Sequence, residues 1–407
     1  MTGVETAPEP RRSPLITRGF AALFVAALAF FGSGNMVLPV ASRYASGPLG
    51  ADATGVGLAI GSFAIAALLL RPVVGWSSDR YGRRPLLILG AALTVVALLL
   101  HLPATTLPVF IAARSLLGVG EAFFFVAAVA ALSDMAPPER RGEAINIGSL
   151  AVYLGLAIGP FVGESILAAS GYDSVWLAAA GMAALATVLT LLVPETAPGA
   201  LRRRLDGERP PRTPLIHRAG FRPGFLMLMG MWGMAGFFAF IPLYTTHLGM
   251  SGAGPALALY AVIVVTLRIV FVRLPDQMGP ARLSAIALIG SSIGLAILGL
   301  VGTPLGVYLG TAVFAVGIAF LYPALLALAV ARVDEMERGA VVGTTTAFVD
   351  VAFGLAPAVL GAAVAVVGLG GTFLLSALIA AGGGLSLVAR RDVFGGSATI
   401  ERDTLPG

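Results

Sequence analysis

Three acidic residues stand inside long apolar stretches of the sequence: Glu121, Glu164 and Asp350. If each stretch crosses a bilayer as a helix that rises about 1.5 Å per residue, Glu121 and Asp350 lie within roughly 5 Å of the midplane and Glu164 lies about 12 Å toward the outside. Burial favours the neutral carboxyl group, whereas a nearby arginine favours the carboxylate. We therefore expect Glu121 and Asp350 to bind a proton or a cation, and a purely structural hydrogen bond is the alternative.

An arginine precedes the first of these acids by two helical turns, in the run Arg114-Ser-Leu-Leu-Gly118-Val-Gly-Glu121. Residues at this spacing share one helix face. An ionisable residue inside a membrane span is a functional candidate by default. We group Arg114 and Glu164 with Glu121 and Asp350 as candidate proton-coupling residues. The alternative is that Arg114 and Glu121 only neutralise each other.

A second pattern, Gly75-Trp-Ser-Ser-Asp79-Arg80-Tyr-Gly82-Arg83-Arg84, lies between two apolar stretches. Its glycines allow a tight turn, and its carboxylate can cap the N-terminus of a neighbouring helix. Its arginines favour the inner face of a membrane. The simpler alternative is a basic loop that only sets topology.

A third pattern, Gly155-Leu-Ala-Ile-Gly159-Pro160-Phe-Val-Gly163-Glu164, lies inside an apolar stretch. Glycines at this spacing form a stripe that lets a neighbouring helix approach closely, and Pro160 can kink the helix. Ordinary helix packing would explain the glycines, although not the Gly-Pro spacing.

The other polar candidates are weaker, because aromatic residues in membrane helices more often pack or mark the interface. Neither His101 nor His247 belongs to a cluster of acids and histidines, and we place both at the membrane interface. The chain lacks cysteine and lysine, which excludes thiolate sites, Schiff bases and a P-loop lysine. We expect no metal, no other cofactor and no enzyme activity. Candidates for a substrate cavity are Asn35, Tyr153, Trp232, Tyr260 and Tyr322.

Composition shows which elements must position these residues. Of the 407 residues, 57% are hydrophobic and 12% are charged, against roughly 25% charged residues in soluble domains. The apolar residues form blocks long enough to cross a bilayer, where only helices satisfy the backbone. The twelve expected spans are 19–41, 54–77, 85–102, 107–132, 144–168, 175–193, 225–246, 253–274, 283–301, 304–330, 340–367 and 372–389.

The arginines set the expected orientation. With both termini inside, Arg43 is the only arginine in an outer loop, whereas the inner loops and termini hold many. This distribution follows the positive-inside rule, so the basic charge is a topology signal and we expect no nucleic-acid partner. We predict a multi-pass protein of a bacterial-type inner membrane with cytoplasmic termini.

The chain divides into two related halves. The expected segments are a cytoplasmic N-terminal segment 1–18, a six-helix bundle 19–193, a cytoplasmic linker 194–222, a second six-helix bundle 223–389 and a cytoplasmic tail 390–407. A constant offset of 197 residues relates the halves, which indicates a parallel repeat about an axis along the membrane normal. The matched pairs are Arg71/Arg268, Asp79/Asp276, Gly82/Gly279, Arg141/Arg338, Gly142/Gly339 and Pro160/Pro357.

The three patterns resemble signatures of the major facilitator superfamily, and the resemblance extends over residues 19–389. The Gly75–Arg84 run matches the superfamily's loop signature at every defined position, and Arg114 and Gly118 resemble its fourth-span element. The loop resemblance implies a latch in which Asp79 docks near Gly339 when the inner side is closed. The fifth-span run resembles the antiporter signature, with Glu164 in place of the last glycine.

The resemblance implies an all-α major facilitator fold of two six-helix bundles. It also implies a proton-coupled antiporter that exports a small organic or drug-like solute, similar to twelve-span drug:proton antiporters or to arabinose-efflux-permease-like exporters. A proton-coupled importer and a non-transporting membrane sensor are the alternatives. The expected partners are protons, a small-molecule substrate and the lipid bilayer, with the chain acting as a monomer. An aromatic and acidic cavity suits amphiphilic or cationic compounds; sugars, peptides and metal chelators stay open.

Overall fold

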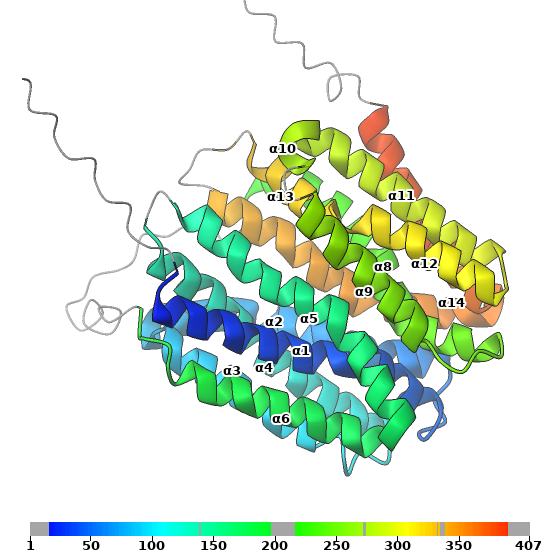
Figure 1. Ribbon diagram of the computed structural model, residues 1–407, viewed down its shortest axis with the longest axis horizontal. Helices are drawn as coiled ribbons and strands as arrows, with labels where there is room; N and C mark the ends of the chain where they lie inside the picture. Colours follow the sequence, from blue (N-terminus) through cyan, green and yellow to red (C-terminus); the bar gives the residue numbers. More distant parts are fainter. Residues whose placement is uncertain are drawn as a thin grey trace, which may run out of the picture.

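The computed structural model describes residues 16–137, 140–196, 216–271, 274–331, 333 and 338–389. Within these ranges all regular structure is helical, and the helices run side by side along the long axis of the molecule (Figure 1). We call the end where α1 begins and α6 ends the linker end, and the opposite end the far end.

The first half consists of six helices joined by short turns. Side-chain caps begin two of them: the Thr17 hydroxyl accepts from the Phe20 N–H at 3.2 Å, and the Asp52 carboxylate accepts from the Gly55 N–H at 2.7 Å. Such caps satisfy backbone donors that the first turn of a helix leaves free. The helices are α1 (Arg18–Ser46), α2 (Ala53–Tyr81), α3 (Arg83–Leu99), α4 (Leu107–Met135), α5 (Arg141–Ser170) and α6 (Tyr172–Thr190).

The second half repeats this plan with two interruptions. Gly368, with a φ of 71°, divides the longest helix into two spans, close to the predicted boundary between residues 367 and 372. The predicted span 304–330 is two helices separated at residues 319–320. The elements are η2 (Arg218–Gly220), α8 (Phe221–His247), α9 (Gly254–Val270), α10 (Leu274–Met278), α11 (Pro280–Leu300), α12 (Pro304–Ile318), α13 (Leu321–Val330) and α14 (Arg338–Val388).

Nine helical stretches in the described ranges are long and apolar enough to cross a membrane. Twelve spans result when the 17-residue helices α3 and α9 are included and α14 is divided at Gly368, because 17 residues is the lower limit for a spanning helix, about 25 Å long. Most of the predicted linker, residues 197–215, lies outside the described residues, as do residues 1–15 and 390–407.

Most helix–helix packing lies within each half, and fewer pairs of helices pack between the halves. In the first half α1 packs on α5 and α6, and α4 on α2 and α3; in the second half α14 packs on α8 and α11, and α12 on α9 and α11. Between the halves α2 lies along α14, α5 along α9 and α1 along α8. At Gly57 and Gly61 of α2, an added Cβ would collide with the backbone carbonyl oxygens of Pro357 and Gly354. Glycine therefore permits this close approach.

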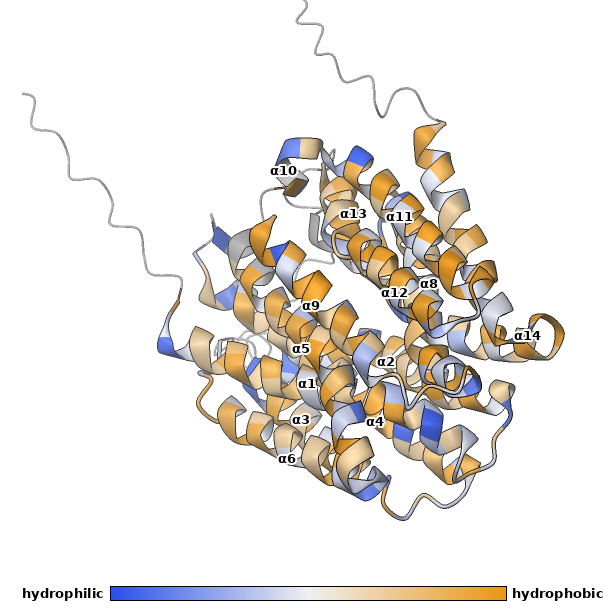
Figure 2. Cartoon of the chain, turned by 45° about the vertical axis from the view of Figure 1, so that its right-hand side comes forward, coloured by the Kyte–Doolittle hydropathy of each residue, from blue (hydrophilic) through white to orange (hydrophobic). Residues whose placement is uncertain are grey.

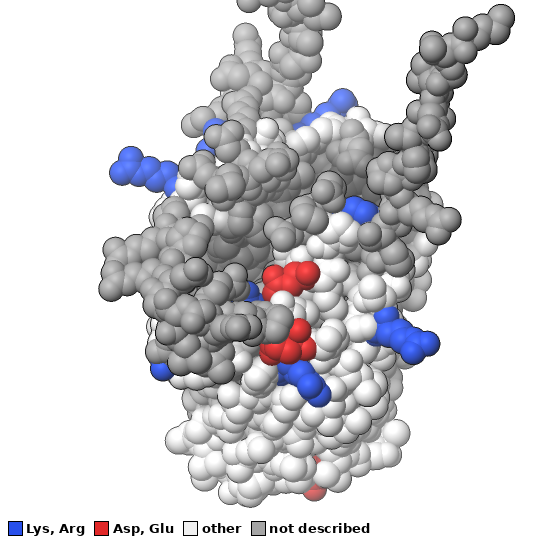
Figure 3. Space-filling view, turned by 90° about the vertical axis from the view of Figure 1, so that its left-hand side faces the viewer, with Lys and Arg blue, Asp and Glu red and all other residues white. Residues whose placement is uncertain are grey.

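The outer surface is apolar along the length of the helices (Figure 2). Large side chains such as Leu69, Val366 and Leu378 are mostly exposed, as expected where lipid replaces water. Viewed from the linker end, the surface carries several arginine and acidic side chains, and its lower part carries almost none (Figure 3). Such a surface fits a protein embedded in a bilayer with its polar ends in water.

Candidate functional site

An ion pair joins the two halves deep in the bundle. The Arg71 Nη2 of α2 lies 2.8 Å from the Asp350 Oδ1 of α14, and the two side chains are 20% and 12% exposed. The guanidinium also lies over the Phe125 ring of α4, 5.0 Å from its centroid. A charge-assisted bond in a medium of low polarity is strong, so this pair is a major contact between the halves. The sequence analysis selected Asp350 but used Arg71 only as a repeat marker.

Glu121 of α4 completes an acidic cluster beside this pair. It lies in the electrostatic range of Arg71, and Asp350 in that of both Arg71 and Glu121. Its Oε2 and the second oxygen of Asp350 are buried and lack hydrogen-bond partners among the described residues. An unpaired buried carboxylate oxygen is costly, and a proton or a ligand donor would relieve that cost. The arrangement is therefore suited to exchange a proton.

Arg114 does not pair with Glu121 in the part of the chain that the structure describes. Its side chain is almost completely buried, and its Nε donates to the Ala59 carbonyl oxygen over 3.4 Å. The guanidinium lies 5.4 Å from the centroid of the Phe63 ring, also in α2. The alternative of a self-neutralising Arg114–Glu121 pair is therefore wrong for this structure, and Arg114 links α4 to α2.

The second half carries the repeat counterpart of the Arg71–Asp350 contact. Adding 197 to 71 gives Arg268, and subtracting 197 from 350 gives Tyr153. The Arg268 guanidinium of α9 lies over the Tyr153 ring of α5, 3.5 Å from its centroid. The Tyr153 ring in turn meets Tyr322 of α13 at 5.6 Å in an edge-to-face geometry. The two cross-half contacts are thus related by the repeat, with an acid in one and a phenol in the other.

Glu164 lies apart from this cluster, near the far end. Its carboxylate accepts a hydrogen bond from the Arg43 Nη1 at 2.8 Å; the Glu164 side chain is 3% exposed and the Arg43 side chain 27%. A Cβ added at Gly252, in the turn before α9, would lie 3.3 Å from Arg43 Nη1 and 3.5 Å from Glu164 Oε2. The Glu164–Arg43 pair of the first half therefore packs against the second half and helps to close the far end.

The Gly75–Arg84 run is held by the end of α6. Glu195 accepts from the backbone N–H groups of Arg83 at 2.9 Å and of Arg84 at 3.2 Å, so it caps the start of α3. Gly82 has a φ of 98°, and a Cβ there would lie 2.4 Å from the Glu195 carboxylate, which explains the glycine. The Arg83 side chain pairs with Asp134 at 3.2 Å. An acid that the sequence analysis did not select, in the segment that follows α6, therefore caps α3, and the predicted capping role of Asp79 stays a prediction.

Two parts of the latch prediction fall on residues that the structure leaves open. The Asp79 side chain and the residues around Gly339 lie outside the side chains described. Arg80 stacks on two aromatic rings, with its guanidinium 4.9 Å from the Trp76 centroid and 5.2 Å from the Tyr81 centroid. Gly75 has open space where a Cβ would stand. The docking of Asp79 near Gly339 stays a prediction.

The glycine stripe of α5 faces α1. A Cβ on Gly155 would lie 2.8 Å from the Phe31 carbonyl carbon, and one on Gly159 would lie 2.9 Å from the Met36 nitrogen. Gly163 meets the Met36 backbone in the same way. These glycines, with Pro160 inside the same helix, therefore bring α5 close to α1 within the first half.

The weaker cavity candidates separate into two groups. Tyr153 and Tyr322 belong to the cross-half cluster described above. The Asn35 amide donates to the Phe31 carbonyl oxygen of its own helix at 2.8 Å, and the buried Trp232 Nε1 has no partner among the described residues. Tyr260 packs in the core of the second half, 5.7 Å from the Phe237 ring. Tyr153 and Tyr322 thus lie against each other beside Arg268, and a role of any of the five residues in a substrate cavity stays a prediction.

Neither histidine placed at the interface takes part in the cluster. His247 is exposed at the end of α8, as expected. His101 is instead fully buried: its Nδ1 lies 2.7 Å from the Ala97 carbonyl oxygen, and its ring packs against Phe110 and Trp176. His101 thus lies just after the end of α3, where α6 covers it, and its position at the membrane interface stays a prediction.

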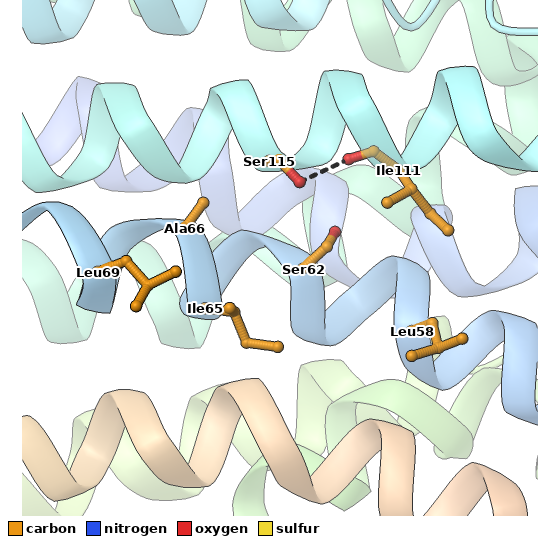
Figure 4. A pocket seen from close by; sticks show the side chains of 7 residues that line it. All are labelled: Leu58, Ser62, Ile65, Ala66, Leu69, Ile111 and Ser115. Atoms are coloured by element: carbon orange, nitrogen blue, oxygen red, sulfur yellow. Dashed lines mark hydrogen bonds between the residues drawn. The ribbon is translucent and has the colours of Figure 1, made fainter.

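A separate groove of about 340 Å³ lies between α2 and α4 (Figure 4). The Ser115 hydroxyl donates to the Ile111 carbonyl oxygen at 2.9 Å, so it is satisfied within its own helix. The groove carries no charged residue, and we do not assign it to the site. Within the described ranges no group of three acids, histidines or cysteines could hold a metal ion. The groove is lined by Leu58, Ser62, Ile65, Ala66, Leu69, Ile111 and Ser115.

Comparison of the fold with solved structures gives full-length matches. The human organic anion transporter MFSD10 aligns with a TM-score of 0.68 at 17% identity, covering 91% of this chain and 99% of that one. A POT family transporter in complex with a thioalcohol-conjugated peptide aligns at 0.76 and 16%, covering 91% and 96%. At these identities the similarity shows the fold.

Sequence comparison agrees. An uncharacterized MFS-type transporter of Salmonella typhimurium is 29% identical over 338 residues, 80% of this chain and 84% of the relative. One of Methanocaldococcus jannaschii is 24% identical over 84% and 90% of the two chains. The family model of the Major Facilitator Superfamily matches residues 22–313. This chain therefore belongs to the Major Facilitator Superfamily and is a multi-pass membrane transporter, not an enzyme.

Proposed function

We propose that this transporter is a proton-coupled antiporter that exports a small organic solute by alternating access. The observation that carries the proposal is the Arg71–Asp350 ion pair between the halves, with Glu121 beside it and two buried carboxylate oxygens left unpartnered among the described residues. A carboxylate in such a place can bind either a proton or a donor group of the substrate. Exchange of a bound proton for bound substrate couples the proton flux to the substrate flux.

The proposed cycle uses the contacts between the halves. Solute binds from the inside while Glu121 or Asp350 is ionised, and a proton from the outside displaces it. Protonation of Asp350 weakens its bond to Arg71, because a neutral carboxyl group attracts a guanidinium less strongly. That change favours rearrangement of α2 against α14. The Asp79 latch would stabilise the state closed at the linker end.

Two further observations support the class and direction. The α5 run that contains Gly155, Gly159, Pro160 and Gly163 resembles the antiporter signature, which favours export over the importer alternative. The structural neighbours include an organic anion transporter and POT family transporters in complex with a conjugated peptide and with 5-aminolevulinic acid. A sensor without transport would have no need for ionisable groups between its halves.

The coupling test uses Glu121→Gln and Asp350→Asn in proteoliposomes, with a compound first found by counterflow against a panel. At least one variant should lose uptake driven by a pH gradient yet keep exchange of substrate for substrate, because the amide cannot change protonation state. Asp173→Asn, an exposed acid in the first turn of α6, is the control and should keep both activities. If both test variants keep gradient-driven transport, the coupling proposal is wrong.

The direction test measures accumulation in cells. Cells that express the transporter should accumulate less compound than cells without it, and collapse of the proton gradient should remove the difference. Higher accumulation on expression would favour the importer alternative. Absence of flux for every compound of the panel, with the protein present in the membrane, would favour the sensor.

We also propose an inner-membrane location, a monomeric state and a linker end that faces the cytoplasm, following the arginines. The chain has no cysteine, so single cysteines report topology directly. A cysteine at the exposed Ser251 should react with an impermeant maleimide in intact cells, whereas one at Tyr81 should react only after lysis. Tyr81 suits this test because its side chain is exposed, whereas that of Ser78 in the same run is buried and would react poorly. Labelling at position 81 in intact cells would reverse the orientation.

A further inference from the structure

The central cluster holds two arginines and two acids. Tyr322 lies in the electrostatic range of Arg71, Asp350 and Arg268, and Asp350 in that of Glu121. The four charged side chains therefore belong to one site between the halves, although they come from α2, α4, α9 and α14. With both acids ionised their charges sum to zero, two positive and two negative.

The two arginines of this site differ in how they are neutralised. Arg71 donates to Asp350 at 2.8 Å, whereas within the described ranges no carboxylate pairs with Arg268. Arg268 lies over the Tyr153 ring, and its buried Nε has no hydrogen-bond partner there. A partly desolvated guanidinium without an anion is costly, and its planar fork matches a carboxylate. Arg268 is therefore a candidate for binding an anionic group.

The two acids differ in their ion pairs. Asp350 pairs with Arg71 through one oxygen, whereas Glu121 has no ion pair among the described residues; each acid also has one buried oxygen without a hydrogen-bond partner there. A primary amine would supply both the charge and the hydrogen-bond donors that this oxygen lacks. Arg114 cannot donate to this Glu121 oxygen in place of an amine, because its side chain is almost completely buried between its own helix and α2.

We infer that the substrate is a zwitterionic organic solute, with its carboxylate bound by Arg268 and its amine bound by Glu121. The inference rests on the proposed function and names its substrate class. A neutral site with separated charges complements such a solute and leaves no net charge buried. The Tyr153 and Tyr322 rings offer apolar surface to the rest of the molecule. Protonation of Glu121 removes the negative charge that binds the ammonium group, so proton and solute compete for Glu121, as antiport requires.

The test measures binding to the purified full-length protein in detergent by isothermal titration calorimetry. The probes are phenylalanine, phenethylamine, which lacks the carboxylate, and 3-phenylpropanoate, which lacks the amine. Equivalent sets built on alanine and on the dipeptide Phe-Phe cover other sizes. In at least one set the zwitterion should bind at least tenfold more tightly than both partners.

Variants assign the two ends of the solute. Arg268→Gln should lower the affinity for the zwitterion to that of the amine, and Glu121→Gln should lower it to that of the carboxylate. Arg268→Lys keeps the charge and should keep part of the preference, which separates loss of binding from loss of folding. Arg282→Gln, a cation at the start of α11 outside the cluster, should change nothing.

Three outcomes would overturn the inference: no binding in any set, an amine that binds as tightly as its zwitterion, or an Arg268→Gln protein that keeps the preference. The measurement needs no proton gradient. If the protein binds a zwitterion but shows no gradient-driven exchange, the coupling proposal is wrong and the substrate class stands. If it shows gradient-driven exchange but does not prefer a zwitterion, the substrate class is wrong and the coupling proposal stands.

Discussion

Glu164→Gln should shift the protein away from the state closed at the far end. Glu164 is 3% exposed and pairs with Arg43 at 2.8 Å, directly against Gly252 of the other half. The pair itself lies within the first half, so opening of the far end does not break it. Opening does admit water to the carboxylate and removes the neighbouring backbone of Ala253. The closed state therefore has a hydrogen bond from the Ala253 backbone to the ionised carboxylate that the open state lacks.

The size of this shift follows from the contacts. A hydrogen bond to a charged group contributes about 1.5–3 kcal/mol, and Arg43 is 27% exposed, which screens part of it. If opening forfeits about two-thirds of the lower figure, the difference is about 1 kcal/mol, or about fivefold in the ratio of open to closed molecules. Glu164→Gln keeps the volume and removes the charge, so packing should be little changed.

Spin labels can measure this ratio, because the chain has no cysteine to remove. Labels at Asp173 and Gly302, far-end positions of the two halves, should report a longer distance when that end opens. Glu164→Gln should enlarge the long-distance population about fivefold, and Arg43→Gln should do so similarly. The double variant should add little to either single change. Unchanged distances in Glu164→Gln, or fully additive effects, would refute this account of far-end closure.

Three further predictions concern the first half. Glu195→Gln should lower the melting temperature of the purified protein by a few degrees, because loss of a charged cap costs about 1 kcal/mol. Gly155→Ala should cost about 1–3 kcal/mol by overpacking α5 against α1, whereas Gly181→Ala, with open space at its Cβ position, should be neutral or stabilising; equal effects in thermal unfolding would contradict the packing argument. Asp79→Asn should reduce transport severalfold at near-normal expression, and unchanged flux would remove the latch.

The span pattern was predictable because the bilayer imposes its thickness on every helix. Expected spans such as 107–132 and 340–367 lie within α4 and α14, and even the break at Gly368 falls between two predicted spans. The division between α12 and α13 was missed, although Pro323 signals it. Proline has no N–H to bond the carbonyl oxygen of residue 319, and its ring clashes with that carbonyl group, so the helix breaks at residues 319–320.

The site was only partly predictable, because partners far apart in sequence make it. Glu121 and Asp350 were identified from their positions inside apolar stretches. Arg71 and its repeat partner Arg268 showed the same signal, because each is an ionisable residue inside an apolar span. Glu195 had only its place after a proline at the end of a span. No pattern in the sequence shows that it caps α3, 112 positions away from Arg83.

In the proposed cycle, the repeat gives one contact between the halves a group that can respond to protons and the other contact a group that does not. Arg71 and Arg268 occupy equivalent positions, and each reaches across to the equivalent place on the opposite half, where one half has Asp350 and the other Tyr153. The aspartate can alternate between charged and neutral forms, whereas a tyrosine, with an ordinary pKa near 10, keeps its proton. Arg268 therefore keeps an aromatic contact that a proton does not break, and its charge stays available to a ligand throughout the cycle.

If Tyr153 were replaced by Asp, both contacts would be ion pairs, and the new carboxylate would compete with the solute's carboxylate for Arg268. Tyr153→Asp should thus weaken zwitterion binding at least as much as Arg268→Gln does, whereas Tyr153→Phe, which keeps the ring under the guanidinium, should preserve it.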